Sequence, residues 1–330
     1  MNAVGLSVKA LCKAGFARTL LKVTRGTPTI LMYHGVDGDH NLDGLTDCNG
    51  KHVEVALFRQ QLEFLAASCT VVPLATLVSA VRAGESHRRM VAITFDDGFL
   101  NNASCAAPVL TEFGFTATIF LATGFIGTNR WMWTDRLESA LHRTAKADFR
   151  PALLGETLSL SNVAARRHAL QRLKDNLKVL HWHEAEAHVG NLERELEVDL
   201  IPPWGLYRFM AWDDVRRLRD AGFEIGAHTV NHAILSKVPA DEAELEILNS
   251  RDHIVREIGE CSPTFCYPNG KRSDYTAQVR DFCSRHFSAT LSAIKGPARR
   301  TDMFDLRRLA IDNATSPRML ASMLAQVGYE

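Results

Sequence analysis

The feature that most constrains this chain is the apolar run VAITF at residues 91–95, which ends directly in Asp96, Asp97 and Gly98. A short run of β-branched and aromatic residues that stops at a turn is typical of a buried strand. In α/β folds, parallel strands gather their ligands at their carboxyl ends, where these two carboxylates would lie. Two carboxylates at a low-dielectric edge call for a cation or a shared proton. The alternative is that Asp-Asp-Gly only turns the chain and caps the next helix.

Other parts of the chain repeat this strand-and-helix pattern, which predicts parallel β-α units. About eight strands follow residue 28, so we expect an α/β fold, an irregular (β/α) barrel of about seven to eight strands with a helical insertion. The expected strands are 29–33, 70–72, 91–95, 116–122, 223–227, 263–267, 287–291 and 306–311. The expected helices are 54–68, 73–82, 104–113, 162–180, 183–198, 241–258 and one ended by Gly222, capped by Asp213 or Asp214.

The alternation lapses between residues 129 and 209, where charged residues are frequent. This segment has few strongly apolar faces of its own and a possible hairpin at 153–160, so we interpret it as an insertion in the barrel and not as an independent domain. The predicted organisation is an N-terminal helical extension at 1–27 and one barrel at 28–330. Length alone would also allow two average domains.

Composition excludes some functions. A formal net charge of +0 gives no electrostatic reason to expect a nucleic-acid partner. Seven cysteines without a Cys-x-x-Cys pair fit a reducing compartment, and no signal peptide or membrane-spanning run is evident, so we expect a cytoplasmic protein. The basic residues at 1–26 allow a peripheral contact with the inner face of the membrane. Packing of that helix on the protein's own surface is the simpler alternative.

His228 and His232 are four residues apart, directly after the expected strand 223–227. On one helical turn this spacing puts both imidazoles on one face, close enough to bind a single ion. Together with Asp96 or Asp97 they would give the set of two histidines and one carboxylate found in catalytic zinc and non-haem iron sites.

The motifs at 94–98 (TFDDG) and 228–232 (HTVNH) resemble the first two motifs of the polysaccharide deacetylase family, carbohydrate esterase family four, over residues 28–125 and 205–315. The resemblance implies that Asp97, His228 and His232 bind a divalent metal, most often zinc, and that Asp96 is the general base. It also implies a metal-dependent hydrolase that removes N-acetyl groups from an amino sugar in a glycan or glycan precursor.

The segment FCYPNG at 265–270 resembles a variant of the family's third motif, which usually reads Arg-x-Pro-Tyr and lines the groove. This implies that Tyr267 contacts substrate and that the backbone N–H of Asn269 helps to hold an oxyanion. Cys266 stands where the usual arginine would orient the base. We expect Arg308, in the late strand 306–311, to replace it; the alternative is a solvated charge.

The last family motif normally provides a histidine as general acid, but no histidine follows His286. His34 ends the expected strand 29–33 on the same face as Asp96 and is our candidate acid; a histidine buried for packing is the alternative. Trp133 and Trp212 flank the insertion and could stack on sugar rings, or anchor the insertion in the core.

Three other functional classes share part of this pattern. A non-catalytic glycan-binding barrel would keep the fold without the chemistry, and another non-peptide C–N amide could be the bond that is hydrolysed. Acyl-phosphate phosphatases need Asp-x-Asp, whereas here the two Asp residues are adjacent. The histidines at 181, 183 and 188 look rich in metal ligands, but without a strand end nearby a solvated helix is favoured.

Overall fold

The protein is described here from a computed structural model, which covers residues 27–38, 47, 50–85 and 89–327. Its centre is a closed parallel barrel in the order β1, β12, β11, β10, β9, β6, β5, with β5 paired again to β1, and β4 extends the sheet from β5. The predicted barrel of seven to eight strands is confirmed. The strands are β1 (Thr29–Tyr33), β4 (Thr70–Val71), β5 (Met90–Phe95), β6 (Thr118–Leu121), β9 (Glu224–Ala227), β10 (Thr264–Cys266), β11 (Ala289–Lys295) and β12 (Leu306–Ala310).

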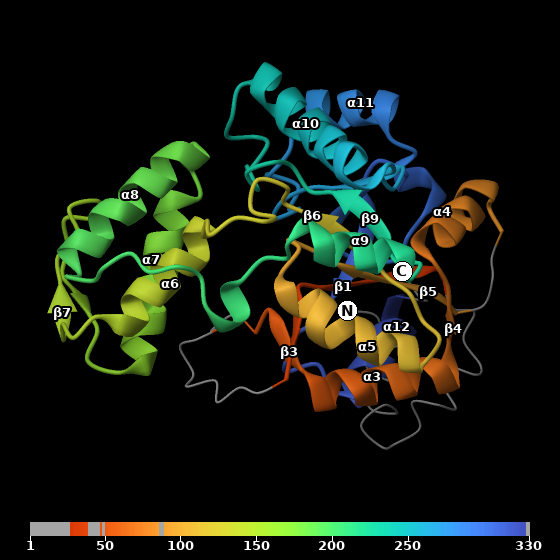
Figure 1. Ribbon diagram of the computed structural model, residues 1–330, viewed down its shortest axis with the longest axis horizontal. Helices are drawn as coiled ribbons and strands as arrows, with labels where there is room; N and C mark the ends of the chain where they lie inside the picture. Colours follow the sequence, from red (N-terminus) through yellow and green to blue (C-terminus); the bar gives the residue numbers. More distant parts are fainter. Residues whose placement is uncertain (1–26, 39–46, 48–49, 86–88, 328–330) are drawn as a thin grey trace.

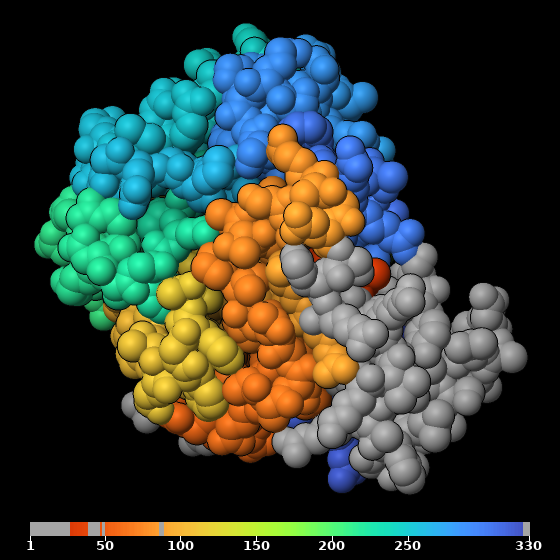
Figure 2. Space-filling view, turned by 90° about the vertical axis from the view of Figure 1, so that its right-hand side faces the viewer, coloured from red at the N-terminus to blue at the C-terminus, as the bar shows by residue number. Residues whose placement is uncertain are grey.

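Helices cover the outside of the barrel (Figure 1). In the turned view of Figure 2, the orange segment that contains α4 lies beside the blue C-terminal part of the chain, in agreement with a hydrogen bond from Arg82 to the carbonyl of Ser288. The outer helices are α3 (Val55–Ser68), α4 (Leu74–Ala83), α5 (Ala107–Glu112), α9 (Trp212–Asp220), α10 (Ala240–Ile258), α11 (Ala277–His286) and α12 (Pro317–Val327).

Alternation along β5 decides which side chains face the site. Val91, Ile93 and Phe95 belong to the larger apolar cluster, which also includes residues of the surrounding helices. Ala92 belongs to a second cluster, with residues from other strands and from α4. Because successive strand residues point to opposite faces, the side chain of Asp96 points to the same face as those of Ala92 and Thr94. The same period brings Cys266 of β10 and Leu306 of β12 to that second cluster. Asp96 therefore faces the interior of the barrel at its carboxyl end.

The insertion forms a separate lobe, at the left of Figure 1. It contains α6 (Trp133–Arg143), α7 (Val163–Leu177), α8 (Trp182–Glu195) and the antiparallel pair β7 (Asp148–Phe149) and β8 (Leu158–Ser159). Residues of all three helices form an apolar cluster of the lobe's own. The expectation of few apolar faces was wrong, because charged residues on the outer faces masked the helical period. The hairpin begins earlier in the sequence than the expected 153–160, because its first strand is β7 at 148–149.

Several local details differ from the sequence expectation. The helix expected at 104–113 starts with a π-helical turn, Asn102–Ala106, before α5. Helix α9 begins at Trp212 after the N-cap Ala211, and the Asp214 side chain accepts from the Ala211 N–H at 2.8 Å, so neither Asp213 nor Asp214 is the cap residue. The sequence interpretation also missed α6, α11 and α12.

The expected helical extension lies almost entirely at residues 1–26, outside the described residues, and so does its contact with a membrane. Among the residues that the structure describes, no helix combines the length and apolarity needed to cross a bilayer.

Candidate active site

Asp96 lies at the end of β5, buried at 3% exposure, and is held by a two-pronged contact with Arg308 of β12. Arg308 Nη1 donates to Oδ1 and Nη2 donates to Oδ2, both at 2.7 Å. Burial raises the pKa of Asp96, but the charge and hydrogen bonds of Arg308 outweigh it, so the pKa lies below its ordinary range. The carboxylate is thus ionised at neutral pH. Its Oδ2 atom keeps a second acceptor position, whereas Oδ1 also faces the thiol of Cys266.

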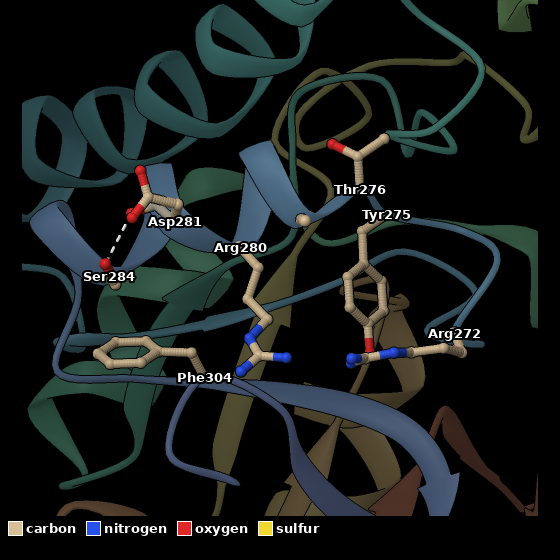
Figure 3. A pocket seen from close by; sticks show the side chains of 8 residues that line it. Arg272, Tyr275, Thr276, Arg280, Asp281, Ser284 and Phe304 are labelled. Carbon is tan, nitrogen blue, oxygen red and sulfur yellow. Dashed lines mark hydrogen bonds between the residues drawn. The ribbon is translucent and has the colours of Figure 1, made fainter.

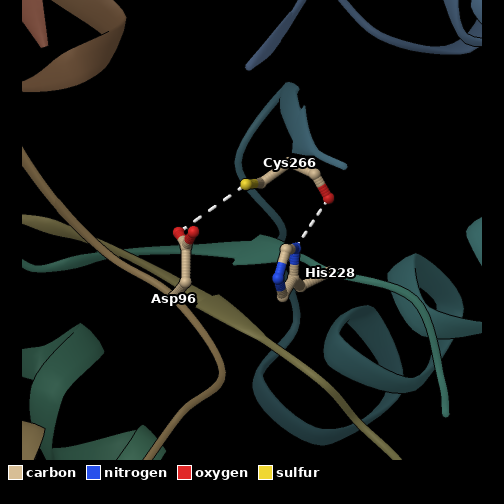
Figure 4. Close-up of side chains that lie close together, drawn as sticks. All are labelled: Asp96, His228 and Cys266. Atoms are coloured by element: carbon tan, nitrogen blue, oxygen red, sulfur yellow. Dashed lines mark hydrogen bonds between the residues drawn. The ribbon is translucent and has the colours of Figure 1, made fainter. Parts of the chain in front are cut away.

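Cys266 of β10 completes this interior cluster (Figure 4). Its thiol lies 3.6 Å from Asp96 Oδ1 and 3.0 Å from Arg308 Nη2, and its carbonyl oxygen lies 2.7 Å from His228 Nδ1. A small side chain here leaves room for the Arg308 guanidinium, which also donates to the carbonyl of Ser292 at 2.9 Å. Arg308 thus lies where it was expected, against Asp96, although β12 is far from β5 in the sequence.

Asp97 turns away from Asp96 and faces the two histidines. Its Oδ1 atom lies 3.6 Å from His228 Nε2 and 3.3 Å from His232 Nε2. Asp97 has a positive φ of 76°. This turn of the backbone lets the two adjacent carboxylates point to different partners, Asp96 to Arg308 and Asp97 to the histidines. The spacing of the histidines works differently from our expectation, because residues 228–232 form a loop and not a helical turn, with positive φ at Thr229 (64°) and His232 (54°).

These three side chains fit a divalent metal. One carboxylate oxygen and two imidazole nitrogens converge, and Asp97 Oδ1 is buried without a hydrogen-bond donor among the described residues. His228 Nδ1 faces a carbonyl oxygen, so the ring's Nε2 is free to bind as the unprotonated atom. Burial lowers the pKa of His228 to about 4, which keeps the imidazole neutral. Burial raises the pKa of Asp97.

His34 and Asn269 lie at the ends of strands that meet this site. His34 directly follows β1, whose Tyr33 pairs with Phe95 of β5, so it stands beside the Asp pair. Its positive charge would lower the pKa of both Asp96 and Asp97, although burial is the larger influence on each. Asn269 follows β10 with a positive φ of 56° in a tight turn closed by the Gly270 N–H and the Pro268 carbonyl at 2.6 Å.

The three aromatic residues expected to contact substrate differ in exposure. Tyr267 is 1% exposed, its ring is stacked on Tyr275 with centroids 4.0 Å apart, and its hydroxyl donates to the Phe304 carbonyl at 3.4 Å. Such a position favours packing over contact with a sugar. Trp133 packs against the insertion's apolar cluster and Trp212 against the barrel's, and both rings are partly exposed. Substrate contact by these residues stays a prediction.

An ion pair between Lys51 and Asp135 was not foreseen. Lys51 Nζ lies 2.7 Å from Asp135 Oδ1. It also lies 5.2 Å from the centre of the Phe99 ring, and Phe99 follows Asp97 by two residues. Asp135 belongs to α6 of the insertion and is 1% exposed. The pair joins the insertion to the barrel near the segment that carries Asp97. No sequence signal marks it, because Lys51 follows a polar loop and Asp135 lies in a helix that we missed.

A hollow of about 640 Å³ lies elsewhere, on the flank of the barrel along α11 (Figure 3). Arg280 and Phe304 extend toward it, and Arg272 forms an ion pair with Asp305 at its edge. Its lining contains none of the residues predicted for catalysis or metal binding. Among the histidines of the insertion, His181 pairs with Glu242 of α10, its Nε2 atom lying 2.9 Å from Oε2.

Enzymes with (β/α) barrels carry their active sites at the carboxyl ends of the strands, which is where this chain brings together two histidines, a carboxylate and a buried Asp-Arg pair. The family model for polysaccharide deacetylases matches residues 83–284, and the chain belongs to this family. The resemblance drawn from the two short motifs is thereby confirmed.

Solved structures show the same fold at low sequence identity. The deacetylase PplD of Streptococcus pyogenes, solved with acetate, aligns with a TM-score of 0.61 at 17% identity over 90% of this chain and 98% of its own. IcaB from Ammonifex degensii gives 0.58 at 15% identity over 91% and 97%. The polysaccharide deacetylase BC0361 of Bacillus cereus gives 0.56 at 16% identity over 90% and 69%. No curated protein sequence matches this chain significantly.

Proposed function

We propose that this protein is a metal-dependent hydrolase that removes N-acetyl groups from an amino sugar in a glycan or glycan precursor. Family membership supports deacetylation of a polysaccharide in general terms. The observation that carries the finer proposal is the division of the Asp pair, with Asp96 against Arg308 and Asp97 against two histidines. A cytoplasmic location is also part of the proposal. The described cysteines are all free, which agrees with a reducing compartment.

Asp97, His228 and His232 would hold the divalent ion, zinc by the nature of the ligands, which when bound lowers the pKa of water toward neutrality and polarises the amide carbonyl. Asp96 is the general base that takes the proton of the attacking water. Arg308 keeps Asp96 ionised and fixes the direction in which the remaining acceptor position of Oδ2 points. This fixed direction matters because proton transfer needs hydrogen-bond geometry between base and water.

The N–H of Asn269 would donate to the oxyanion of the tetrahedral intermediate. His34 would then protonate the departing amine, since it lies beside the Asp pair at the end of β1. The C–N bond breaks, and the products are acetate and a free amino sugar. Two alternatives stand beside this proposal: hydrolysis of another non-peptide C–N amide, and glycan binding without catalysis. The intact Asp96–Arg308 pair favours catalysis, because a binding module has no need of a fixed ionised base.

The test is acetate release from a panel of acetylated amino-sugar polymers, lipid-linked sugars and nucleotide-linked sugars, with and without a chelator. We expect release with at least one substrate, loss with the chelator and recovery with added zinc. Asp96→Asn should lower kcat by about 10²–10⁴-fold. Asp213→Asn, on the exposed side of α9, is the matched control and should behave like the wild type. Wild-type activity in Asp96→Asn would exclude the proposed base.

A further inference from the structure

The loop between the two metal-binding histidines has a conformation that needs support. Thr229 and His232 both have positive φ, at 64° and 54°. Residues other than glycine adopt this region at a cost, and they keep it only where the surroundings determine the backbone. The positions of both imidazoles therefore depend on what holds residues 229–231.

Glu246 of α10 supports the loop through hydrogen bonds to its backbone and to one of its side chains. Its Oε2 atom accepts the backbone N–H groups of Val230 at 2.9 Å and Asn231 at 2.8 Å, and its Oε1 atom accepts from Asn231 Nδ2 at 2.6 Å. Glu246 is 6% exposed. Three donors on one buried carboxylate form charge-assisted hydrogen bonds, which are stronger than neutral ones and fix the loop in one position.

Arg130 holds the same asparagine from the opposite side. Its Nη1 atom donates to Asn231 Oδ1 at 2.9 Å, and its guanidinium lies 4.8 Å from the centre of the Phe125 ring. Arg130 also pairs with Glu186 of the insertion at 3.2 Å, but both side chains are partly exposed, so this outer link contributes little. The Asn231 amide thus has its donor side on Glu246 and its acceptor side on Arg130.

We propose that Glu246 is a positioning residue of the metal site, because it fixes the loop between His228 and His232 and so the positions of both imidazoles. Arg130 contributes to the same effect through its hydrogen bond to Asn231. The inference rests on the proposed function, because it assumes that the two histidines bind the metal. Neither residue contacts the reacting atoms, so the effect is expected first in metal affinity.

The experiment measures zinc and cobalt affinity of the full-length protein by competition with a coloured chelator, together with the visible spectrum of the cobalt form. We expect Glu246→Ala to weaken metal binding by about 10–100-fold. Glu246→Gln keeps one acceptor oxygen and should retain much of the affinity. Arg130→Leu should weaken binding by a smaller factor. Glu244→Gln, on the same helix, is the matched control and should bind metal like the wild type.

A purely structural role for Glu246 would lower thermal stability and leave the affinity and cobalt spectrum of the folded fraction unchanged, and that result would overturn the proposal. If Glu246→Ala does not fold, the metal affinities of Glu246→Gln and Arg130→Leu provide the same test, because each variant keeps part of the hydrogen bonds to the loop. If the wild type itself binds no divalent ion, the proposed function fails and the positioning role with it. Wild-type binding with equal binding by all three variants rejects the positioning role alone.

Discussion

Asp96 and Arg308 form a buried ion pair at the centre of the site. Arg308 is 1% exposed and Asp96 3%, so both charges are removed from water and depend on each other. Breaking such a pair by removing one partner costs about 3–5 kcal/mol, because an uncompensated charge stays buried. The guanidinium reaches this carboxylate from β12, and its Nη2 atom also lies 3.0 Å from the thiol of Cys266 on β10.

We expect Arg308→Met to lower the free energy of unfolding by about 3–5 kcal/mol and to raise the pKa of Asp96. In an Asp96→Asn background the same substitution should cost much less, since no charge is left alone. Urea unfolding of the wild type, both single variants and the double variant gives the coupling energy. If the two substitutions changed the free energy of unfolding additively, Asp96 and Arg308 would not be energetically coupled, which would contradict this prediction.

A second residue-scale prediction concerns pH. His228 has a pKa lowered to about 4 by burial, whereas an unfolded histidine titrates near about 6.5. Between these values the unfolded chain binds a proton that folded His228 does not, so the free energy of unfolding of the metal-free protein should fall as pH falls through this window. Each unit of pKa shift contributes about 1.4 kcal/mol at most. The lowered pKa of His232 acts in the same direction, and the raised pKa of Asp97 opposes it.

Urea unfolding of the metal-free protein at several pH values between about 4.5 and 7 measures this dependence. His228→Asn should make the dependence shallower, and His168→Asn, at an exposed position of α7, should leave it as in the wild type. An unchanged pH dependence in His228→Asn would show that another group is responsible.

At the scale of elements, the turn after β10 places Asn269 and is closely packed on β11. Gly270 has φ of +69°, and a Cβ atom there would lie 2.5 Å from the backbone nitrogen of Ala293. Backbone atoms cannot move aside as the end of a flexible side chain can. The turn that carries the proposed oxyanion donor is thus fixed by its contact with the next strand.

We expect Gly270→Ala to destabilise the protein by about 1–3 kcal/mol through backbone strain, with more from the clash, and to lower kcat by displacing Asn269. Gly155→Ala is the matched control, because Gly155 has φ of +68° but open space around the added Cβ. The difference between the two in thermal unfolding and in kcat isolates the contact with Ala293. Equal effects would mean that this contact does not matter.

At the scale of the whole molecule, the proposed metal ligands follow strands that are distant in the sequence. Asp97 follows β5, and His228 follows β9, on the other side of β6 in the barrel. An ion bound by both would stabilise the folded barrel, since the unfolded chain does not bring these residues together.

Zinc at about 100 times its dissociation constant should raise the free energy of unfolding by about 2.7 kcal/mol. A chelator should reverse the increase, and Asp97→Asn should largely remove it. Thermal unfolding of the metal-free protein over a range of zinc concentrations tests this, with Asp213→Asn as the control. A zinc-dependent increase of the same size in Asp97→Asn would place the ion elsewhere.

Local patterns in the sequence determined much of this molecule. The run 91–95 with its Asp pair, the two histidines after residue 227 and the alternation of strands and helices predicted the barrel and brought Asp96, Asp97, His228 and His232 to one site. These features are readable because strand periods, turns and metal-ligand spacing each depend on residues close together in the chain.

Only the tertiary structure decided which distant residues meet. The register of β12 beside β1 brings Arg308 to Asp96, α10 brings Glu246 under the histidine loop, and α6 brings Asp135 to Lys51. Each contact joins residues that no local period relates, since closing the barrel sets their distance. The chain thus encodes its chemical groups locally, whereas the partners that orient those groups depend on how the whole barrel closes.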